Sequence, residues 1–520
     1  MTVSDSAASR SKPIFALLTG PAAPILAAGL AFLLYGYTAA PGLTWANYGA
    51  DGGDLLAAAM TNGTPHPTGY PLYTLLLQGW LALLGLLWPG SEIAWRGNLF
   101  SAFAGAASVA VTFQVMRHLW PEKKSSFLPA LLAASAWATA PLLWGQALIT
   151  EVYTLHSLLV AALFWALVAF PSGQPGRRGF VLGGLLGLGI AHHVTIGLLV
   201  PGVVYWLWSS EEQPLGRPAL WLWAAMGVMP GVLLYGRALL VSPLAPVNWG
   251  GDGSLGDLWW LVSGAAYRRY LFAVPPAQLL SKVGLWALTI TSQFTPLGLA
   301  LCLAGLHRWD RLTGRLRTLA LLWVLPVSLY TITYHTADSE IYLLPVVWLM
   351  ALWLPFGLRE VAEWLKSQRP SIGWEQFVLG GCLACLLLLI AVRLPALSLR
   401  QDEAARNFVA DAVRVVEPGS LLFSSADAET FALWYGAWGS GELLEASPGT
   451  ALVNVALLQF EWYQALLTRL YPDLAGVETG NATEILQANA GHRPIYFSEI
   501  VAPAVEYQLQ PVGSLWRYTP

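Results

Sequence analysis

Charged residues are scarce in this 520-residue chain. They make up 11% of the sequence, while hydrophobic residues make up 56%. Soluble domains carry about 25% charged residues, so this composition indicates an integral membrane protein. The net charge of −3 and the lack of any basic arm or tract also give no sign of a nucleic-acid partner.

Cysteine is rare as well. Cys302, Cys382 and Cys385 each lie inside an apolar run, so the sequence predicts neither a disulfide framework nor a zinc site. Cys382 and Cys385 form a CxxC pair, but within LACLLLLIAV this pair is more typical of helix packing than of redox chemistry. The chain also lacks an HExxH motif and paired CxxC spacing. We therefore expect no metal and no cofactor.

Long apolar runs fill most of the chain instead. The first run follows a polar N-terminus, and its length favours an uncleaved span, with a cleaved signal peptide as the alternative. Tryptophan is abundant, at 26 residues, which suits side chains that lie at membrane interfaces. The runs lie near residues 14–38, 71–88, 98–119, 127–145, 152–170, 179–208, 219–241, 282–305, 318–334, 341–358 and 375–395.

The lysine and arginine residues between these runs predict how the chain crosses the membrane, because short cytoplasmic loops are enriched in both. Basic residues precede the first run and follow the third, fifth, eighth and tenth. All of them can be cytoplasmic only if the run 71–88 lies on the outer surface as an amphipathic helix. The run 179–208 must also cross twice, with a break near His192 and His193. The sequence thus predicts about eleven spans, with the N-terminus inside and the C-terminus outside.

The last part of the chain has shorter apolar runs and more turn signals. Expected strands and helices alternate there, which predicts a small α/β domain. We therefore expect an all-α membrane bundle of residues 1–395, with a first outer loop at 41–97, and an extracytoplasmic α/β domain of residues 396–520. Strands are expected at 419–425, 450–459 and 493–500, and helices at 427–438 and 460–471.

The stretch 41–71, PGLTWANYGADGGDLLAAAMTNGTPHPTGYP, differs from the apolar runs around it. Asp51 and Asp54 lie among glycines that permit tight turns. The segment DLLAAAMTNG predicts about two turns of helix, and HPTGYP predicts an extended, turned backbone. A loop of this length with little regular structure is usually functional. We interpret it as the working surface of a membrane enzyme.

Other acidic residues near span ends fall on the same, outer side. They are Glu151 in ITEVYTLH, Asp252 and Asp257 in the loop 242–281, and Asp338 and Glu340 in DSEIY. Polar residues at that depth are energetically expensive and so are usually functional. For each residue taken alone, a solvated loop charge is the simpler interpretation. Function is favoured most for Asp51 and Glu151.

Several basic side chains on the outer side are candidates for function. His66 belongs to the first loop, and His192 and His193 interrupt an apolar run, where a hydrogen-bonded packing role is the alternative. Arg268 and Arg269 lie in SGAAYRRYLF, against the positive-inside trend. They could be a hydrated loop pair, but forked guanidinium groups are also well suited to bind phosphate.

These motifs together resemble a known enzyme family. The run GADGGDLLAAAMTNGTPHPTGYPLYTLL, followed by WRGNLFSAF, resembles the GT-C superfamily of membrane glycosyltransferases. Within it, the run is similar to a family of domains of unknown function that includes a eukaryotic transmembrane protein O-mannosyltransferase. The likeness continues through ITEVYTLH, GLGIAHHVT, NWGGDGSLGDLWWLVSGAAYRRYLF and DSEIYLLP. Two departures stand out. Thr68 replaces a second proline, and GADGGD replaces an acidic-Ser pattern, which leaves Asp51 and Asp54 both open as the key residue.

The resemblance implies that a sugar, such as mannose, moves from a polyprenyl-phosphate donor to a protein, glycan or lipid acceptor outside the cytoplasm. A first-loop carboxylate, Asp51 or Asp54, can serve as general base, with Glu151 as a second acidic partner. A single displacement would invert the anomeric centre. Cationic or dipolar groups would neutralise the departing phosphate, and the candidates are His66, His192, His193, Arg268 and Arg269. The candidates for the sugar or acceptor pocket are Tyr70, Tyr153, Asp338 and Tyr342.

Two other functions remain open at this point. Membrane carboxylates also mark ion and substrate paths, as in a transporter or flippase. The acidic residues here lie in outer loops rather than at mid-span, however, and no inverted repeat is visible. A non-catalytic assembly protein of the cell envelope is the second alternative.

Overall fold

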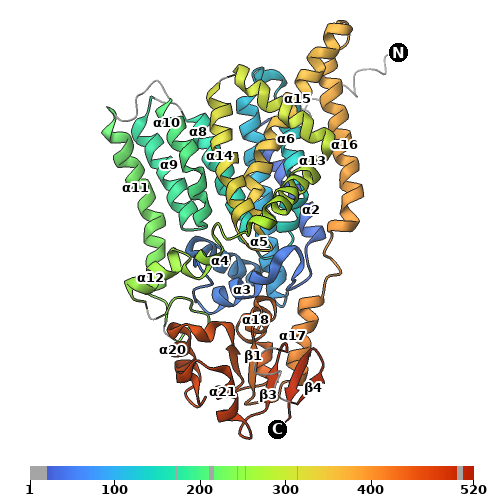
Figure 1. Ribbon diagram of the computed structural model, residues 1–520. Coiled ribbons are helices and arrows are strands. Elements are labelled where there is room, and N and C mark those ends of the chain that lie inside the picture. The colour runs from blue at the N-terminus through green and yellow to red at the C-terminus, as the bar shows by residue number, and fades with distance from the viewer. Residues whose placement is uncertain are drawn as a thin grey trace.

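The computed structural model describes residues 20–170, 173–209, 216–242, 244–251, 253–312, 314–500 and 508–519. Helices form an elongated bundle, and a small domain covers one of its ends (Figure 1). The helices of the bundle are α2 (Ala23–Thr38), α5 (Ile93–Leu119), α6 (Phe127–Ala138), α8 (Tyr153–Ala169), α9 (Pro175–Ile190), α10 (Val200–Trp208), α11 (Pro218–Tyr235), α13 (Pro276–Leu312), α14 (Gly314–Thr333), α15 (Leu344–Gln368) and α16 (Trp374–Leu397).

Six helical segments in the described part of the chain are long and apolar enough to cross a membrane. The other helices of the bundle are shorter, so about eleven crossings require short or locally thinned passages. Shorter elements join the helices: η1 (Ala46–Asp51), α3 (Gly52–Met60), α4 (Pro71–Leu87), η2 (Lys123–Ser125), α7 (Pro141–Gln146), η3 (Val194–Leu199), η5 (Gly236–Leu239), α12 (Leu255–Val262), η6 (Ala265–Tyr270) and η7 (Ser339–Leu343).

Proline and glycine explain much of the helix arrangement. Pro71, Pro175 and Pro218 stand at the start of α4, α9 and α11, where a missing N–H costs no helical hydrogen bond. Helices α9 and α11 then pack backbone to backbone. A Cβ on Gly183 would lie 2.0 Å from the carbonyl oxygen of Ala224. Small residues allow such close approach of helices in membranes.

The predicted break in the run 179–208 is confirmed. Helix α9 ends at Ile190, His192 and His193 form the turn, and η3 leads into α10. Helix α4 lies between the bundle and the C-terminal domain in Figure 1, and it is too short to count among the six long segments. Its place on the outer membrane surface stays a prediction.

Basic loops gather at the end of the bundle that lies away from the C-terminal domain. The guanidinium group of Arg308 lies 2.7 Å from the carboxylate of Glu363, and that of Arg359 lies 2.5 Å from Glu122. Such exposed pairs contribute little stability. They do bring together the loops that follow the third, eighth and tenth apolar runs. This agrees with the prediction that the basic residues of these loops lie on one side of the membrane.

The C-terminal domain contains a five-stranded sheet in the order β2-β1-β3-β5-β4. Strand β1 (Leu421–Ser424) is parallel to β2 (Ala451–Asn454) and β3 (Ile495–Phe497), while β5 (Leu515–Tyr518) is antiparallel to β3 and β4 (Leu509–Val512). The helical elements are α17 (Ala404–Val415), α18 (Asp427–Trp434), η8 (Tyr435–Gly439), α19 (Glu442–Ala446), η9 (Ala456–Gln459), α20 (Glu461–Leu470), η10 (Val477–Thr479) and α21 (Ala482–Asn489).

Three strands were predicted and all three exist, but the second prediction was too long. The segment 450–459 is extended only to Asn454 and continues as the 3₁₀ helix η9. The side-chain oxygen of Asn454 accepts a hydrogen bond from the backbone N–H of Leu457 at 2.9 Å, which turns the chain and ends the strand. The hairpin of β4 and β5 was not predicted at all.

The C-terminal domain rests directly on the first outer loop. The indole N–H of Trp45 donates a 3.0 Å hydrogen bond to the carbonyl oxygen of Ala428 in α18. A Cβ on Gly53 would lie only 2.1 Å from the carbonyl oxygen of Phe431, so glycine is required for this contact. Helix α18 is thereby fixed against η1 and α3.

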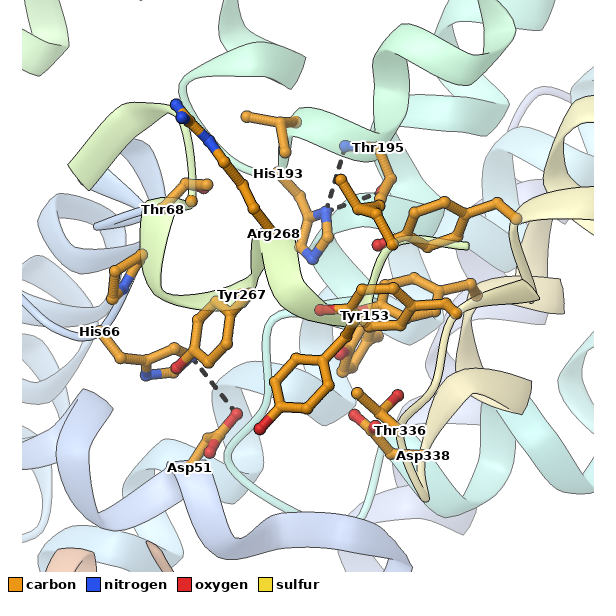
Figure 2. Close-up of a pocket in the computed structure, with 18 of the residues that line it drawn as sticks. Asp51, His66, Thr68, Tyr153, His193, Thr195, Tyr267, Arg268, Thr336 and Asp338 are labelled. Carbon is orange, nitrogen blue, oxygen red and sulfur yellow. Dashed lines mark hydrogen bonds and ion pairs between the residues drawn. The ribbon is translucent and has the colours of Figure 1, made fainter. Parts of the chain in front are cut away.

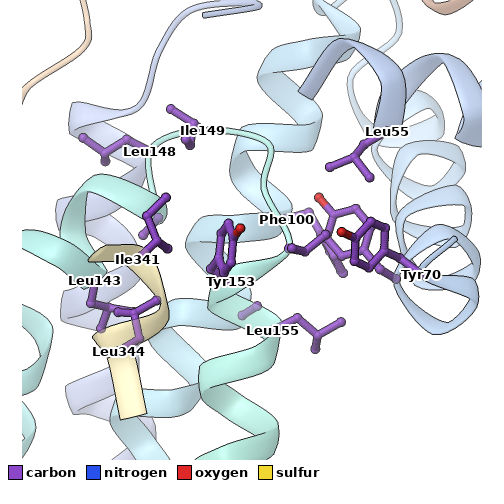
Figure 3. Packing of buried hydrophobic residues seen from close by; sticks show 14 of the residues in the cluster. Leu55, Tyr70, Phe100, Leu143, Leu148, Ile149, Tyr153, Leu155, Ile341 and Leu344 are labelled. Atoms are coloured by element: carbon purple, nitrogen blue, oxygen red, sulfur yellow. The ribbon is translucent and has the colours of Figure 1, made fainter. Parts of the chain in front are cut away.

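A continuous apolar core of the bundle supports the first outer loop on the side away from the C-terminal domain. Figure 3 shows that it combines Leu55 of α3, Phe100 of α5, Leu155 of α8 and Leu344 of α15, all buried. The chain segment around Ile149 lies in the same core. Since interiors of this kind are close-packed, the loops above the core are held in place by elements that are far apart in sequence.

Candidate active site

A cavity of about 690 Å³ lies at the junction of the bundle and the C-terminal domain. Its walls come from the first loop, the turn between α9 and α10, the segment around η6, the segment 330–342 and the start of α18. Figure 2 shows how acidic and basic side chains from these distant segments point into it. The ionisable side chains on its walls include Asp51, His66, His193, Arg268, Asp338 and Asp427.

Two carboxylates of the first loop hold the ring of His66 between them. The Nδ1 atom of His66 lies 2.7 Å from Asp54 Oδ2, and the Nε2 atom lies 3.3 Å from Asp51 Oδ2. Asp54 also accepts hydrogen bonds from the backbone N–H of His66 and from the indole of Trp249, at 2.8 and 3.1 Å. Both ring nitrogens of His66 are therefore engaged.

Asp51 and Asp54 have different surroundings. The side chain of Asp54 is fully buried, and it is absent from the cavity wall, whereas that of Asp51 is 35% exposed and lines the cavity. The helical turn at the start of α3 separates them, because Asp51 ends η1 and Asp54 lies inside α3. Of the two, only Asp51 is open to a substrate.

The pKa values of this group reflect burial and mutual charge. Burial raises the pKa of Asp51 to about 6, against the opposing effect of His66. Burial by itself lowers the pKa of His66, but the charge of Asp51 and the hydrogen bond to Asp54 together raise it to about 9. At pH 7, Asp51 is thus mostly an anion beside a cationic His66.

The HPTGYP segment brings His66 to the cavity through an unusual backbone. Gly69 and Tyr70 have φ values of 80° and 39°, and Tyr48, which also lines the cavity, has a φ of 64°. A Cβ on Gly69 would lie 2.8 Å from Leu261 Cδ2, so glycine is needed for conformation and for space. Strained non-glycine residues cluster at ligand-binding and catalytic sites.

Glu151 and His192, two of the predicted site residues, lie beneath the cavity and are absent from its wall. The side chains of both residues are buried. For Glu151 the reason is that its loop turns into the apolar core. Glu151 Oε2 accepts a 3.2 Å hydrogen bond from the N–H of Val152, and burial raises the pKa of Glu151 well above its usual value. His192 Nε2 lies 2.9 Å from the carbonyl oxygen of Val152.

The two candidate arginines are also separated. Arg268 lines the cavity, and its guanidinium group is directed away from Asp51 in Figure 2. Arg269 is absent from the wall, and its guanidinium group lies over the ring of Tyr270, 4.9 Å from the ring centre. Two consecutive residues of a 3₁₀ turn cannot face the same way.

His193 presents one ring nitrogen to the cavity. Its Nδ1 atom lies 2.7 Å from the hydroxyl of Thr195 and 3.4 Å from the backbone N–H of the same residue. Because a backbone N–H can only donate, Nδ1 is the acceptor and Nε2 carries the proton of the neutral ring. An N–H donor therefore faces the cavity from this side.

Tyrosine rings form a third side of the cavity. Tyr70, Tyr153 and Tyr342 were predicted, and all three line it. The rings of Tyr153 and Tyr342 meet edge to face with their centres 5.8 Å apart. Five further tyrosines of the wall were not predicted, although two of them adjoin the predicted arginines: Tyr48, Tyr267, Tyr270, Tyr330 and Tyr334.

A partly buried lysine fixes the segment that carries Asp338. Lys282 of α13 donates 3.0 Å hydrogen bonds to the carbonyl oxygen of Thr336 and to the hydroxyl of Ser339, and lies 3.5 Å from Glu340. Glu340 is thus engaged in holding this segment rather than exposed to the cavity. Buried pairs of this kind hold a local geometry strongly, because losing one partner strands the other.

The remaining acidic residues of the outer loops have other roles or lie elsewhere. Asp257 forms a capping box with Ser254 at the start of α12, and Asp252 lies outside the described residues. Asp427 was not predicted. It begins α18, just beyond the short turn that follows strand β1, and the carboxyl end of a parallel strand is where α/β domains usually bind ligands. Among the described residues, no group of three His, Cys, Asp or Glu side chains is arranged to hold a metal ion.

Known proteins resemble the chain in parts of its sequence and in its fold. Residues 51–215 match the family model described as the protein O-mannosyl-transferase TMEM260 N-terminal domain. Protein O-mannosyl-transferase TMEM260 of Mus musculus is 28% identical over 209 residues, which is 39% of this chain and 28% of that protein. The Dictyostelium discoideum protein is 24% identical over 302 residues, 53% of this chain and 35% of that protein. The aligned regions thus span about a third of each curated relative.

Solved structures share the fold over nearly the whole chain. ArnT from Cupriavidus metallidurans bound to undecaprenyl phosphate superposes with a TM-score of 0.59 at 14% sequence identity, covering 95% of this chain and 97% of that one. The apo structure of the same protein gives a TM-score of 0.55. This identity is too low to show more than the fold. The chain is a multi-pass membrane protein that shares the fold of ArnT, and its residues 51–215 are similar to the N-terminal domain of the TMEM260 protein O-mannosyl-transferases.

Proposed function

We propose that this chain is a glycosyltransferase that moves a sugar, mannose by its relatives, from a polyprenyl phosphate to a hydroxyl group outside the cytoplasm. The proposal rests on the side chains that line the cavity. It holds an ionised carboxylate supported by a histidine on one side and a guanidinium group with an N–H donor on the other. The names of the relatives and the undecaprenyl phosphate bound to ArnT support the same chemistry.

Asp51 acts as the general base in this proposal. Its carboxylate takes the proton of the acceptor hydroxyl while that oxygen attacks the anomeric carbon of the sugar. The bond between the anomeric carbon and the phosphate oxygen breaks, and polyprenyl phosphate departs with the electron pair. A single displacement inverts the anomeric centre. His66, held by Asp54, orients the carboxylate that it faces.

The opposite side of the cavity receives the donor. Arg268 and the Nε2–H of His193 can donate hydrogen bonds to the phosphate, where negative charge grows as the sugar leaves. The tyrosine rings supply flat apolar surfaces with hydroxyl groups, which suit a sugar. With the donor on the side of Arg268 and His193, the acceptor binds on the opposite side of the cavity, beside Asp51.

Purified protein in lipid vesicles tests the proposal directly. With mannosyl-phosphoryl-undecaprenol and peptides that contain serine or threonine, we expect transfer of mannose with inversion, which NMR of the product can establish. A folded protein that leaves the donor intact would contradict the proposal. Movement of the intact lipid across the bilayer without transfer would instead indicate a flippase.

The rate should depend on pH as a bell-shaped curve. Transfer should fall below pH 6 as Asp51 takes up a proton, and above pH 9 as His66 loses the proton that pairs it with Asp51. Since the folded pKa of His66 lies above its unfolded value of about 6.5, its contribution to stability is complete below that value and is lost as the pH rises through about 9. Initial rates and melting temperatures between pH 5 and 10 check this, and a flat profile would contradict it.

The orientation of the C-terminal domain can be tested by labelling. We propose that it lies outside the cytoplasm, on the side opposite the basic loops. In a variant without native cysteines, a cysteine in place of the exposed Glu445 should react with a membrane-impermeant maleimide added to intact cells. A cysteine in place of the exposed Ser367, in the last turn of α15, should react only after permeabilisation. The reverse pattern would place the cavity on the cytoplasmic side.

A further inference from the structure

The C-terminal domain supplies one carboxylate that the transfer chemistry does not use. Asp427, the first residue of α18, lines the cavity together with Asp51 and Asp338. Its side chain is exposed, and within the described residues its carboxylate accepts no hydrogen bond and forms no ion pair. An unpaired charge on a cavity wall is free to bind a substrate group.

The position of Asp427 is fixed relative to the catalytic residues. The ring of Phe431, one turn along α18, stacks on the ring of His66 with an interplanar angle of 16° and a centre-to-centre distance of 6.1 Å. The contacts of α18 with Trp45 and Gly53 also hold this helix in place. Asp427 therefore stands on a rigid element that is anchored to the histidine beside Asp51.

The charges of the cavity are unequally distributed. Three carboxylates, Asp51, Asp338 and Asp427, line it, and His66 is already shared between two first-loop aspartates. The guanidinium group of Arg268 is directed away from Asp51, and its charge would be neutralised by the donor phosphate. The acceptor side thus keeps an excess of negative charge, which attracts cations and repels anions.

We propose that Asp427 selects the acceptor by binding the group that flanks the acceptor hydroxyl. Peptides in which a serine or threonine is flanked by lysine or arginine are favoured over peptides flanked by glutamate or aspartate. The inference rests on the proposed function and deepens it, because it assigns the acceptor class and gives the C-terminal domain a part in recognition.

Three peptides that differ only in the residues beside one serine test the inference. With mannosyl-phosphoryl-undecaprenol as donor, the wild-type kcat/KM should be about tenfold higher for the lysine-flanked peptide than for the glutamate-flanked one, with the alanine-flanked peptide between them. Asp427→Asn should bring this ratio close to one, and Asp427→Lys should reverse it. The effect should reside in the acceptor KM rather than in the donor KM.

Glu445→Gln is the matched control, since Glu445 is an exposed acid of the same domain that does not line the cavity. It should keep the wild-type ratio, and melting temperatures should show that all variants are folded. A ratio that Asp427→Asn leaves unchanged overturns the inference while transfer itself continues. Release of mannose to water without transfer to any peptide also overturns it, whereas a donor that stays intact overturns the proposed function.

Discussion

Replacement of Asp51 by asparagine is expected to lower kcat for sugar transfer by about 10²–10⁴-fold, the usual contribution of a positioned general base. Asparagine has nearly the same shape, but its amide cannot take the proton of the acceptor hydroxyl. His66 keeps its hydrogen bond to Asp54 in this variant, so the first loop should stay folded. Single-turnover transfer of labelled mannose measures the chemical step, and donor binding measured separately should change little.

Asp54→Asn provides the comparison that separates the two aspartates. Asp54 is sealed from the cavity and accepts its hydrogen bonds from His66 and Trp249. Its loss should lower the melting temperature and move the alkaline limb of the pH profile to lower pH, because His66 then loses a negative neighbour. Its kcat at pH 7 should fall less than that of Asp51→Asn. A folded Asp51→Asn variant with full turnover, or the opposite ranking, would contradict the assignment of the base.

The first loop was the most predictable part of the site because its chemistry is local in sequence. Asp51, His66 and Tyr70 lie within one stretch whose glycines and prolines also determine how the backbone turns. The break at His192 and His193 was predictable for a related reason. A polar pair inside an apolar run and the balance of basic loops both required the chain to reverse there.

Which of two neighbouring residues faces the cavity could not be read from the sequence. Asp51 and Asp54 are three residues apart, and their exposure depends on where η1 ends and α3 begins. Arg268 and Arg269 diverge because a 3₁₀ turn directs them to different sides, and nothing local marks which one faces the site. Side-chain direction in such turns is a property of the tertiary packing.

Asp427 lay beyond prediction for another reason. It reaches the cavity only because α18 packs on the first loop, through contacts such as that of Phe431 with His66. Hydrophobic patterning predicted three strands and two helical stretches of the C-terminal domain, but it missed α17 and α21 and carries no information about which face docks on the bundle. The hairpin of β4 and β5 escaped because its strands are short and mostly half-buried, so apolar periodicity is weak there.

Arg268→Ala is expected to lower turnover or donor affinity about ten- to a hundredfold. A hydrogen bond to a charged group contributes roughly 1.5–3 kcal/mol, which corresponds to that range of rates. The guanidinium group can stabilise the bound phosphate and the charge that grows on it as the sugar leaves, so both KM for the donor and kcat should respond. Arg268→Lys should restore only part of the loss, because lysine lacks the forked geometry.

Arg269→Ala is the matched control, because the two residues are adjacent, equally charged and both exposed. Arg269 stacks on Tyr270 and does not line the cavity, so its removal should leave the donor kinetics within about twofold of wild type, as is usual for exposed surface positions. If the two variants behave alike, the effect reflects the positive charge of the loop near an anionic lipid surface rather than a phosphate site. In that case the loss should disappear at high salt, where exposed charges are screened. A loss that is confined to Arg268 and persists at high salt would instead place the donor phosphate beside this one guanidinium group.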